Sequence, residues 1–142
     1  MEQLNSIIKH LEQEWDRGLR KDSSSEAKEK LVEIIAEKHG VSFDTVASIM
    51  KRFEIKNYVQ ELFPECLIEV QQDYYMGDSL KMRIDNPDGR IRHLVIFSSE
   101  FMEDFTTDEI FHRLNSWNLK RNLHKAGKKE VLISSNGLSI QG

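Results

Sequence analysis

Hydrophobic residues in the first part of the chain recur every three to four positions, the spacing of amphipathic helices. A first helix is predicted on the stripe Leu4, Ile7, Ile8, Leu11 and Trp15. Ser23 with Glu26 has the spacing of a capping box and predicts the start of a second helix, which runs to about Lys38. We expect this second helix to bury Leu31, Ile34 and Ile35.

A third helix is predicted after Gly40 and Ser42. Glycine is common just past the end of a helix, and serine is a favoured residue for capping the next one. The apolar stripe of this third helix is Val46, Ile49, Met50 and Phe53. A short amphipathic piece over residues 58–63 precedes Pro64, and proline cannot continue a helix. We therefore expect a helical domain over residues 1–64 and a second domain over residues 65–142.

The periodicity changes from helix to strand after Cys66. Apolar and polar residues alternate over 68–71 and 80–85, which predicts strands, and residues 91–97 form a third apolar run. The sequence Asn-Pro-Asp-Gly at 86–89 predicts a turn that joins the second and third of these strands. The second domain therefore opens with a β-hairpin.

A capping box at Thr106 and Glu109 predicts a helix that ends at Gly127 and buries Ile110, Leu114 and Trp117. Residues 130–133 and 138–140 form a second predicted hairpin around Asn136-Gly137. The expected fold is α+β: an N-terminal trihelical unit resembling a helix-turn-helix, followed by a small antiparallel sheet with one helix. The second domain, with its order of hairpin, helix and hairpin, is a candidate for dimerisation or for binding a partner.

The segment 34–53 contains the one run that points to a particular function. Ala36 is small enough for two helices to approach closely, Gly40 allows a sharp turn, and Val41 fits the angle between the helices. Ser42 caps the second of these helices, and its apolar stripe anchors it to the first. In a helix-turn-helix, the remaining face of the second helix enters the DNA major groove.

This run resembles the DNA-binding element of the LacI family of bacterial regulators. The shared pattern stands in this chain as Ala36-Glu37, Gly40-Val41-Ser42-Phe43 and Thr45-Val46. In that family the element begins the chain and a large sugar-binding domain follows, whereas here a helix precedes it. The resemblance implies the motif. This chain departs from it at Asp44, where the family usually has a neutral polar or basic residue, and at Ser48, where the family often has an arginine.

A double-stranded DNA interface is therefore predicted on seven residues of the third helix. Ser42 and Thr45 are expected to touch phosphates, and Phe43 and Asp44 to face bases. Lys51 and Arg52 are expected to neutralise backbone charge, and Ser48 completes the set. We expect a small transcriptional regulator of bacterial or phage type that acts as a self-associating dimer on two half-sites. The alternative is a protein-interaction adaptor or inhibitor that uses the trihelical unit as a scaffold without DNA binding.

A second cluster of cations lies near the C-terminus without an acidic residue between its members. It comprises Lys120, Arg121, His124, Lys125, Lys128 and Lys129. One interpretation is a second phosphate-contacting surface. The other is a local structural role, because cations stabilise the C-terminal end of a helix by opposing its macrodipole.

Composition narrows the other function classes. The 142 residues are 39% hydrophobic and 31% charged, which fits a globular domain with a core. No apolar run reaches the length of a membrane span, and Cys66 is the only cysteine. We therefore expect a cytoplasmic protein without a membrane partner. Neither half is basic, residues 1–65 having a net charge of −3 and 66–142 of −1.

Signatures of catalysis or of a cofactor site are not expected from this sequence. The histidines form no His-Glu-x-x-His pattern, and Cys66 has no partner at metal-ligand spacing. The chain contains no Gly-rich phosphate loop and no Gly-x-Ser-x-Gly elbow. Asp104, Asp108 and Glu109 lie where acidic residues favour a helix start. The expectation is a protein that is not an enzyme and that has neither cofactor nor metal.

Overall fold

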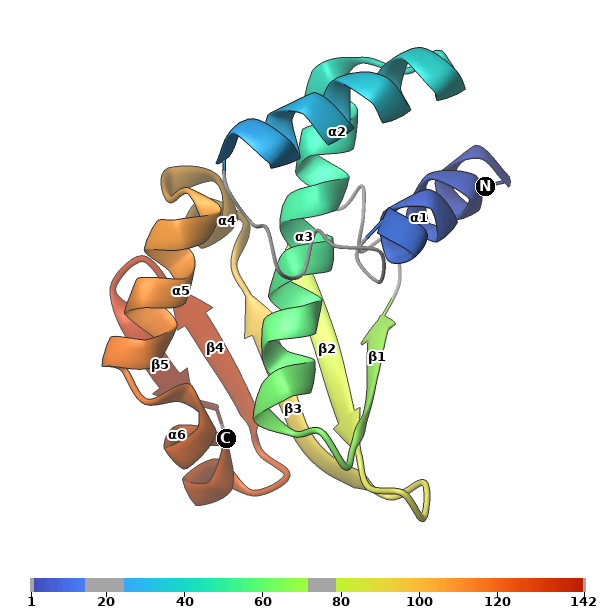
Figure 1. Cartoon of the computed structure of the whole chain (residues 1–142). Helices are drawn as coiled ribbons and strands as arrows, with labels where there is room; N and C mark the ends of the chain where they lie inside the picture. The colour runs from blue at the N-terminus through green and yellow to red at the C-terminus, as the bar shows by residue number, and fades with distance from the viewer. Residues whose placement is uncertain (1, 15–24, 72–78, 142) are drawn as a thin grey trace. The chain divides into compact units, whose positions relative to one another are not determined.

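The computed structural model describes residues 2–14, 25–71 and 79–141. The chain divides into two compact units, which are described separately below. The helical unit is Met1–Phe53, and the sheet unit is Glu54–Gly142. The division falls inside one helix, α3 (Phe43–Leu62). The α+β class expected from the sequence is confirmed (Figure 1).

The helical unit consists of α1 (Glu2–Glu14), α2 (Ser25–His39) and the first part of α3. Each helix contributes a stripe of buried apolar side chains, as the periodicity predicts. The buried set is Ile7 and Leu11 of α1, Leu31, Val32, Ile35 and Ala36 of α2, and Val46, Ile49, Met50 and Phe53 of α3. The expected capping residue of the second helix, Ser23, and the stripe residue Trp15 lie outside the described residues.

The prediction that Ile34 is buried is wrong, since 50% of this residue is exposed. Val32 is buried in its place, together with Leu31 and Ile35. At 100° per residue, the directions of Leu31, Val32 and Ile35 lie within 100° of one another, and Ile34 lies 60° beyond that arc. The periodicity identified the helix correctly but assigned one isoleucine to the wrong edge of its buried stripe.

The helix α3 continues to Leu62 instead of breaking near Phe53, so the short piece predicted over 58–63 belongs to it. Its second half presents Ile55 and Val59, both fully buried, to the core of the sheet unit, and Phe63 follows directly. The helix ends before Pro64, as proline requires. The units therefore divide within α3, ahead of the expected domain boundary at 64/65, because residues 54–63 pack with the strands that follow them.

The sheet has five strands in the order β1-β2-β3-β4-β5. Their bounds are Leu67–Gln71, Leu80–Asp85, Ile91–Phe97, Glu130–Ser134 and Gly137–Ile140. The two expected hairpins are present, β2 pairing with β3 and β4 with β5, both antiparallel. Between β3 and β4 the chain forms α4 (Ser99–Asp104), α5 (Thr107–Ser116) and α6 (Leu119–Ala126).

Two details of the sheet unit differ from the expectation of an antiparallel sheet with one helix. The strands β3 and β4 run parallel, so the sheet is mixed. Parallel neighbours need a long crossover, which residues 98–129 supply as three helices. The predicted helix from Thr106 to Gly127 is two helices, because Asn118 adopts a left-handed conformation (φ 51°) between α5 and α6.

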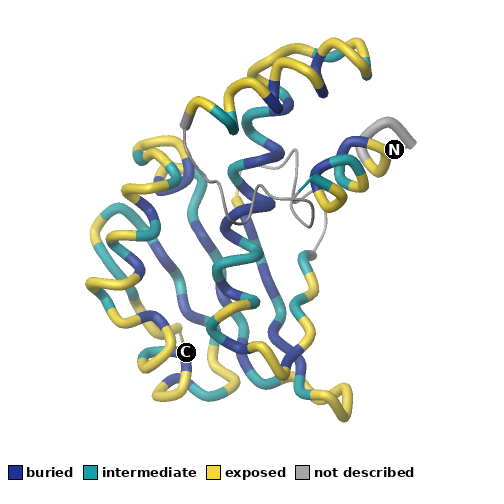
Figure 2. Tube along the Cα trace, viewed as in Figure 1, coloured by how far each residue is buried: buried dark blue, intermediate teal, exposed yellow. Residues whose placement is uncertain are grey.

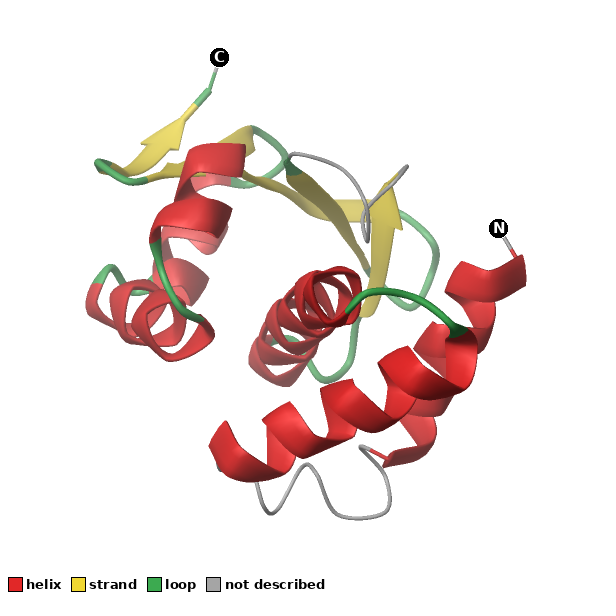
Figure 3. Ribbon diagram, turned by 90° about the horizontal axis from the view of Figure 1, so that it is seen from above, coloured by secondary structure: helices red, strands yellow, loops and turns green. Residues whose placement is uncertain are grey.

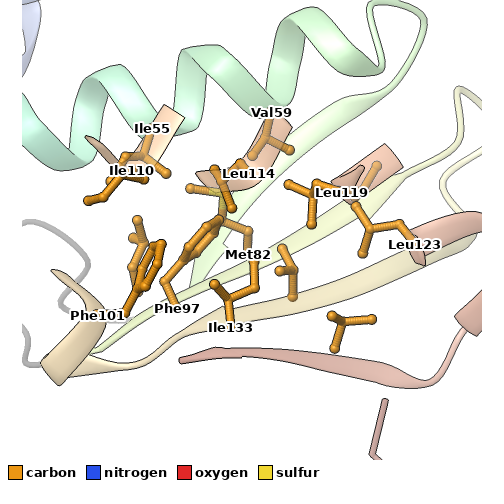
Figure 4. Close-up of a cluster of buried hydrophobic side chains, with 14 of the residues drawn as sticks. Ile55, Val59, Met82, Phe97, Phe101, Ile110, Leu114, Leu119, Leu123 and Ile133 are labelled. Atoms are coloured by element: carbon orange, nitrogen blue, oxygen red, sulfur yellow. The ribbon is translucent and has the colours of Figure 1, made fainter. Parts of the chain in front are cut away.

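The core of the sheet unit lies between one face of the sheet and the helices packed on it. Viewed from above, α5, α6 and the second half of α3 lie on the same side of the strands (Figure 3). Side chains from all of these elements meet in one cluster that includes Phe97, Phe101, Leu114 and Leu123 (Figure 4). Buried segments accordingly alternate with exposed ones along the helices that cover the sheet (Figure 2).

Candidate nucleic-acid interface

The turn between α2 and α3 contains three local features that the sequence predicts, at Gly40, Val41 and Ser42. Gly40 adopts a left-handed φ of 66°, and its position has open space around the missing Cβ, so the requirement for glycine is conformational. The amide of Val41 donates to the carbonyl of Ala36 at 3.1 Å, which closes the end of α2. The amide of Thr45 donates to Ser42 Oγ at 3.1 Å, so Ser42 caps α3.

The first turn of α3 is the accessible part of the predicted interface. Ser42, Phe43 and Asp44 are exposed, Phe43 by 40%. Thr45 is half-buried, and its hydroxyl lies 2.7 Å from Ser42 Oγ. A ligand that approaches the start of α3 therefore meets one aromatic ring, one carboxylate and a hydroxyl pair, together with the free amides of a helix N-terminus.

The later part of α3 offers less to a ligand. Lys51 and Ser48 are half-buried, and Arg52 is only 7% exposed. The guanidinium Nη1 of Arg52 donates to Ser48 Oγ at 2.5 Å and to the Ser48 carbonyl at 3.3 Å. These contacts engage both side chains within the helix. The structure thus brings Ser42, Phe43, Asp44 and Thr45 together at the start of α3 and leaves Arg52 buried.

The second predicted surface lies on the sheet unit. Lys120, Arg121, His124 and Lys125 are exposed on α6, and Lys128 and Lys129 are exposed in the turn that follows it. On the opposite side of α6, Leu119, Leu123 and Ala126 are buried. The helix packs on β3 and β4 through these apolar residues. All six basic residues of the sequence cluster are therefore available to a ligand.

An interaction that the sequence did not indicate lies beneath α6, around the ring of Phe63. The rings of His93 and His124 lie 5.3 and 5.8 Å from it, and Arg92 and Lys120 place their charges 5.3 and 5.7 Å from its centroid. Arg92 also pairs with Glu65, with Nη1 2.7 Å from Oε1. Strand alternation gives no indication of this cluster, because its members come from three separate segments.

His93 is the buried titratable group of this cluster, with 3% of its surface exposed. Its Nδ1 lies 2.8 Å from the carbonyl oxygen of Gly127, which can only accept, so Nδ1 carries the proton. Its Nε2 has no hydrogen-bond partner among the residues that the structure describes. Burial lowers the pKa of His93 below its ordinary 6.5, and the nearby charges of Arg92 and His124 lower it further, against the opposing effect of the Gly127 hydrogen bond.

The sheet unit is therefore expected to lose stability as the pH falls below about 6.5. The unfolded chain binds a proton on His93 near pH 6.5 and the folded chain binds it only at lower pH, so stability falls with pH across that window. Urea unfolding followed by Trp117 fluorescence, in a chain carrying Trp15→Phe, measures this loss between about pH 7.5 and 5.5.

The substitution His93→Asn, which keeps a donor for Gly127, should flatten this pH dependence. His112→Asn is the matched control, because His112 is exposed on α5. Equal pH slopes for wild type and His93→Asn would contradict the assignment.

Comparison of the chain with protein-family models, with curated proteins and with solved structures gave no match. Within residues 2–14, 25–71 and 79–141, no group of three or more His, Cys, Asp and Glu side chains has the arrangement of a metal site. None of the helices in those ranges is both long and apolar enough to cross a membrane.

Proposed function

We propose that this protein is a DNA-binding regulator that contacts double-stranded DNA through the start of α3. The observation that carries the proposal is the turn from α2 to α3, with its left-handed Gly40, the Val41 closure onto Ala36 and the Ser42 cap. Together these features place the exposed Phe43 and Asp44 at the tip of a helix. A helix-turn-helix presents the N-terminal residues of its second helix to base edges in the same way.

The proposed interface on α3 contains few positive charges, and this small number is the reason for proposing a dimer. Arg52 is buried, so of the two cations expected to neutralise backbone charge, Lys51 and Arg52, Lys51 is the one that remains partly accessible. One such helix would neutralise few phosphates, and phosphate neutralisation supplies most of the non-specific affinity for DNA. The proposal therefore includes a dimer that contacts two half-sites about 34 Å apart.

A gain of affinity tests the proposal without the risk of unfolding the protein. In the variant Asp44→Lys, a carboxylate in the first turn of α3 becomes a cation, whose longer side chain can extend from the bases to a neighbouring phosphate. We expect it to bind a random-sequence duplex about tenfold more tightly at low salt, with one further counterion released. Fluorescence anisotropy with a labelled duplex of about 20 base pairs measures both effects.

The matched control is Asp108→Lys, which alters an exposed aspartate in the first turn of α5. Both substitutions place a cation near a helix N-terminus and cost the same few tenths of a kcal/mol, so about equal losses of stability are expected. An identical gain in DNA affinity in the two variants would show that α3 is not the DNA contact. A folded wild-type protein that fails to bind at tens of micromolar would remove DNA as the ligand.

A protein-binding role is the second candidate, and exposed apolar side chains favour it. Ile34 and Phe43 are 50% and 40% exposed on the two helices of the motif. Large exposed apolar residues are more usual in protein interfaces than at a DNA backbone. Under this alternative, Asp44→Lys would leave DNA binding absent, and Ile34→Ser would weaken binding to a protein partner.

A further inference from the structure

The helix α6 and the turn after it have a concentration of positive charge, and one of these charges, that of Lys120, also lies over the ring of Phe63. We name the exposed residues Lys120, Arg121, Lys125, Lys128 and Lys129 the α6 basic surface. None of the five forms an ion pair within the part of the chain that the structure describes. The carboxylate of Glu65 is close enough to Lys120 for an electrostatic attraction. Its ion-pair partner is Arg92, with Nη1 2.7 Å from Oε1.

The directions of these side chains follow from helical geometry. With 100° per residue, the buried Leu119, Leu123 and Ala126 cluster on one side of α6. Lys120, Arg121 and Lys125 spread over an arc of about 140° on the other side. The charges therefore fan out over a convex surface. A small anion could contact one or two of them, whereas an extended polyanion could contact all.

The position of the cations within α6 separates a functional role from a structural one. Cations near a helix C-terminus oppose the macrodipole and stabilise the helix, and this accounts for Lys125 in the last turn. Lys120 and Arg121 lie in the first turn, where a positive charge meets the positive end of the dipole and destabilises the helix. No acidic residue in that turn offsets them. Helix stability thus explains only part of the cluster.

We propose that the α6 basic surface is a second DNA contact, which binds the sugar–phosphate backbone without regard to sequence. The choice of DNA as the polyanion rests on the proposed function, while the surface itself belongs to the sheet unit and does not depend on α3. Lysine and arginine side chains displace condensed counterions from phosphates, and this gives affinity but no sequence information. The large exposed apolar residues all lie outside 119–129, in contrast to an amphipathic helix that inserts into lipid.

The test neutralises the middle of this surface in the full-length protein. The variant Arg121→Gln/Lys125→Gln/Lys128→Gln removes three exposed charges, two from α6 and one from the turn that follows it. Anisotropy with a labelled random duplex should show about tenfold weaker binding or more. The slope of log K against log[salt] should become shallower by about 2–3, close to 0.9 for each lost phosphate contact. The control Lys9→Gln/Lys30→Gln/Arg90→Gln removes the same charge from other exposed positions.

Thermal unfolding of the same variant supplies a second measurement. A structural role for the whole cluster predicts a lower Tm. In the triple variant, the unfavourable dipole interaction removed with Arg121 offsets the favourable one lost with Lys125 in the last turn, so we expect a Tm about equal to that of the wild type. A clear fall in Tm with unchanged DNA affinity would show that the cluster has a structural role and would overturn the proposed contact.

The failures of this inference and of the proposed function are distinguishable. Equal DNA affinity and equal salt slope in the triple variant and its control overturn the α6 contact and leave the α3 proposal standing. Loss of binding in the triple variant, together with no response to Asp44→Lys, supports the α6 contact and overturns the α3 proposal. If the wild type binds phosphatidylserine vesicles through α6 and does not bind DNA, both proposals fall and the surface is a lipid contact.

Discussion

The substitution Leu114→Ala is expected to destabilise the sheet unit by about 2–5 kcal/mol. Leu114 is fully buried on α5, in the cluster that joins the helices to the sheet (Figure 4). Removing its isobutyl group leaves a cavity between elements that cannot all close around it, so both the transfer energy and the packing are lost. Urea unfolding followed by Trp117 fluorescence reports the effect in a Trp15→Phe background, because Trp117 packs against this cluster.

Leu67→Ala is the matched control for this prediction. It makes the same chemical change in the same unit, at a β1 position that is 66% exposed. Exposed substitutions usually change stability by about 0.5 kcal/mol or less. Similar losses in the two leucine variants would show that the core is not where the structure places it.

The substitution Ile49→Ala is expected to destabilise the helical unit by about 2–5 kcal/mol and, under the proposed function, to abolish DNA binding with it. Ile49 is 1% exposed and belongs to the buried stripe of α3 in that unit. Without its side chain, α3 loses part of the packing that holds the helices of this unit together. Circular dichroism at 222 nm against temperature measures the loss of helix, and anisotropy measures the loss of binding.

Ile34→Ala provides the comparison, since Ile34 lies on α2 and is 50% exposed. Its truncation should change stability by less than about 0.5 kcal/mol. A large loss in Ile34→Ala would instead mean that this residue is covered in solution, as by a second copy or a protein partner. The two isoleucines thus test the packing of the unit and the alternative function in one experiment.

Local chemistry made most of the elements predictable from the sequence. The Ser42 cap, the capping box of Thr106 with Glu109 and the turn at 86–89 depend on neighbours within a few positions, and the structure confirms them. The left-handed Asn118 was missed because its conformation depends on the two helices that it separates. The parallel pairing of β3 with β4 was missed because strand periodicity carries no information about direction.

The sequence predicted the turn that positions the candidate site better than it predicted which of the site's side chains are exposed. The residues that shape the turn, Gly40, Val41 and Ser42, lie where the pattern places them. The burial of Arg52 could not be predicted from the sequence. It depends on the tertiary packing around α3 and on the hydrogen bond from Arg52 to Ser48. The charge pattern of the sequence revealed the basic cluster after residue 119. The bounds of α6 were needed to show that Lys120 and Arg121 lie in its first turn, where their charges interact unfavourably with the helix dipole.

The parallel pairing of β3 with β4 also bears on the order in which the chain can fold. Contacts of the helical unit join segments that are close in sequence, whereas β4 cannot pair until the crossover over residues 98–129 has brought it back to β3. Closing so long a loop costs entropy before the strand contacts compensate for it, and non-local pairing slows folding. During synthesis, the helical unit could therefore fold before β4 and β5, the last two strands of the sheet unit, have been made.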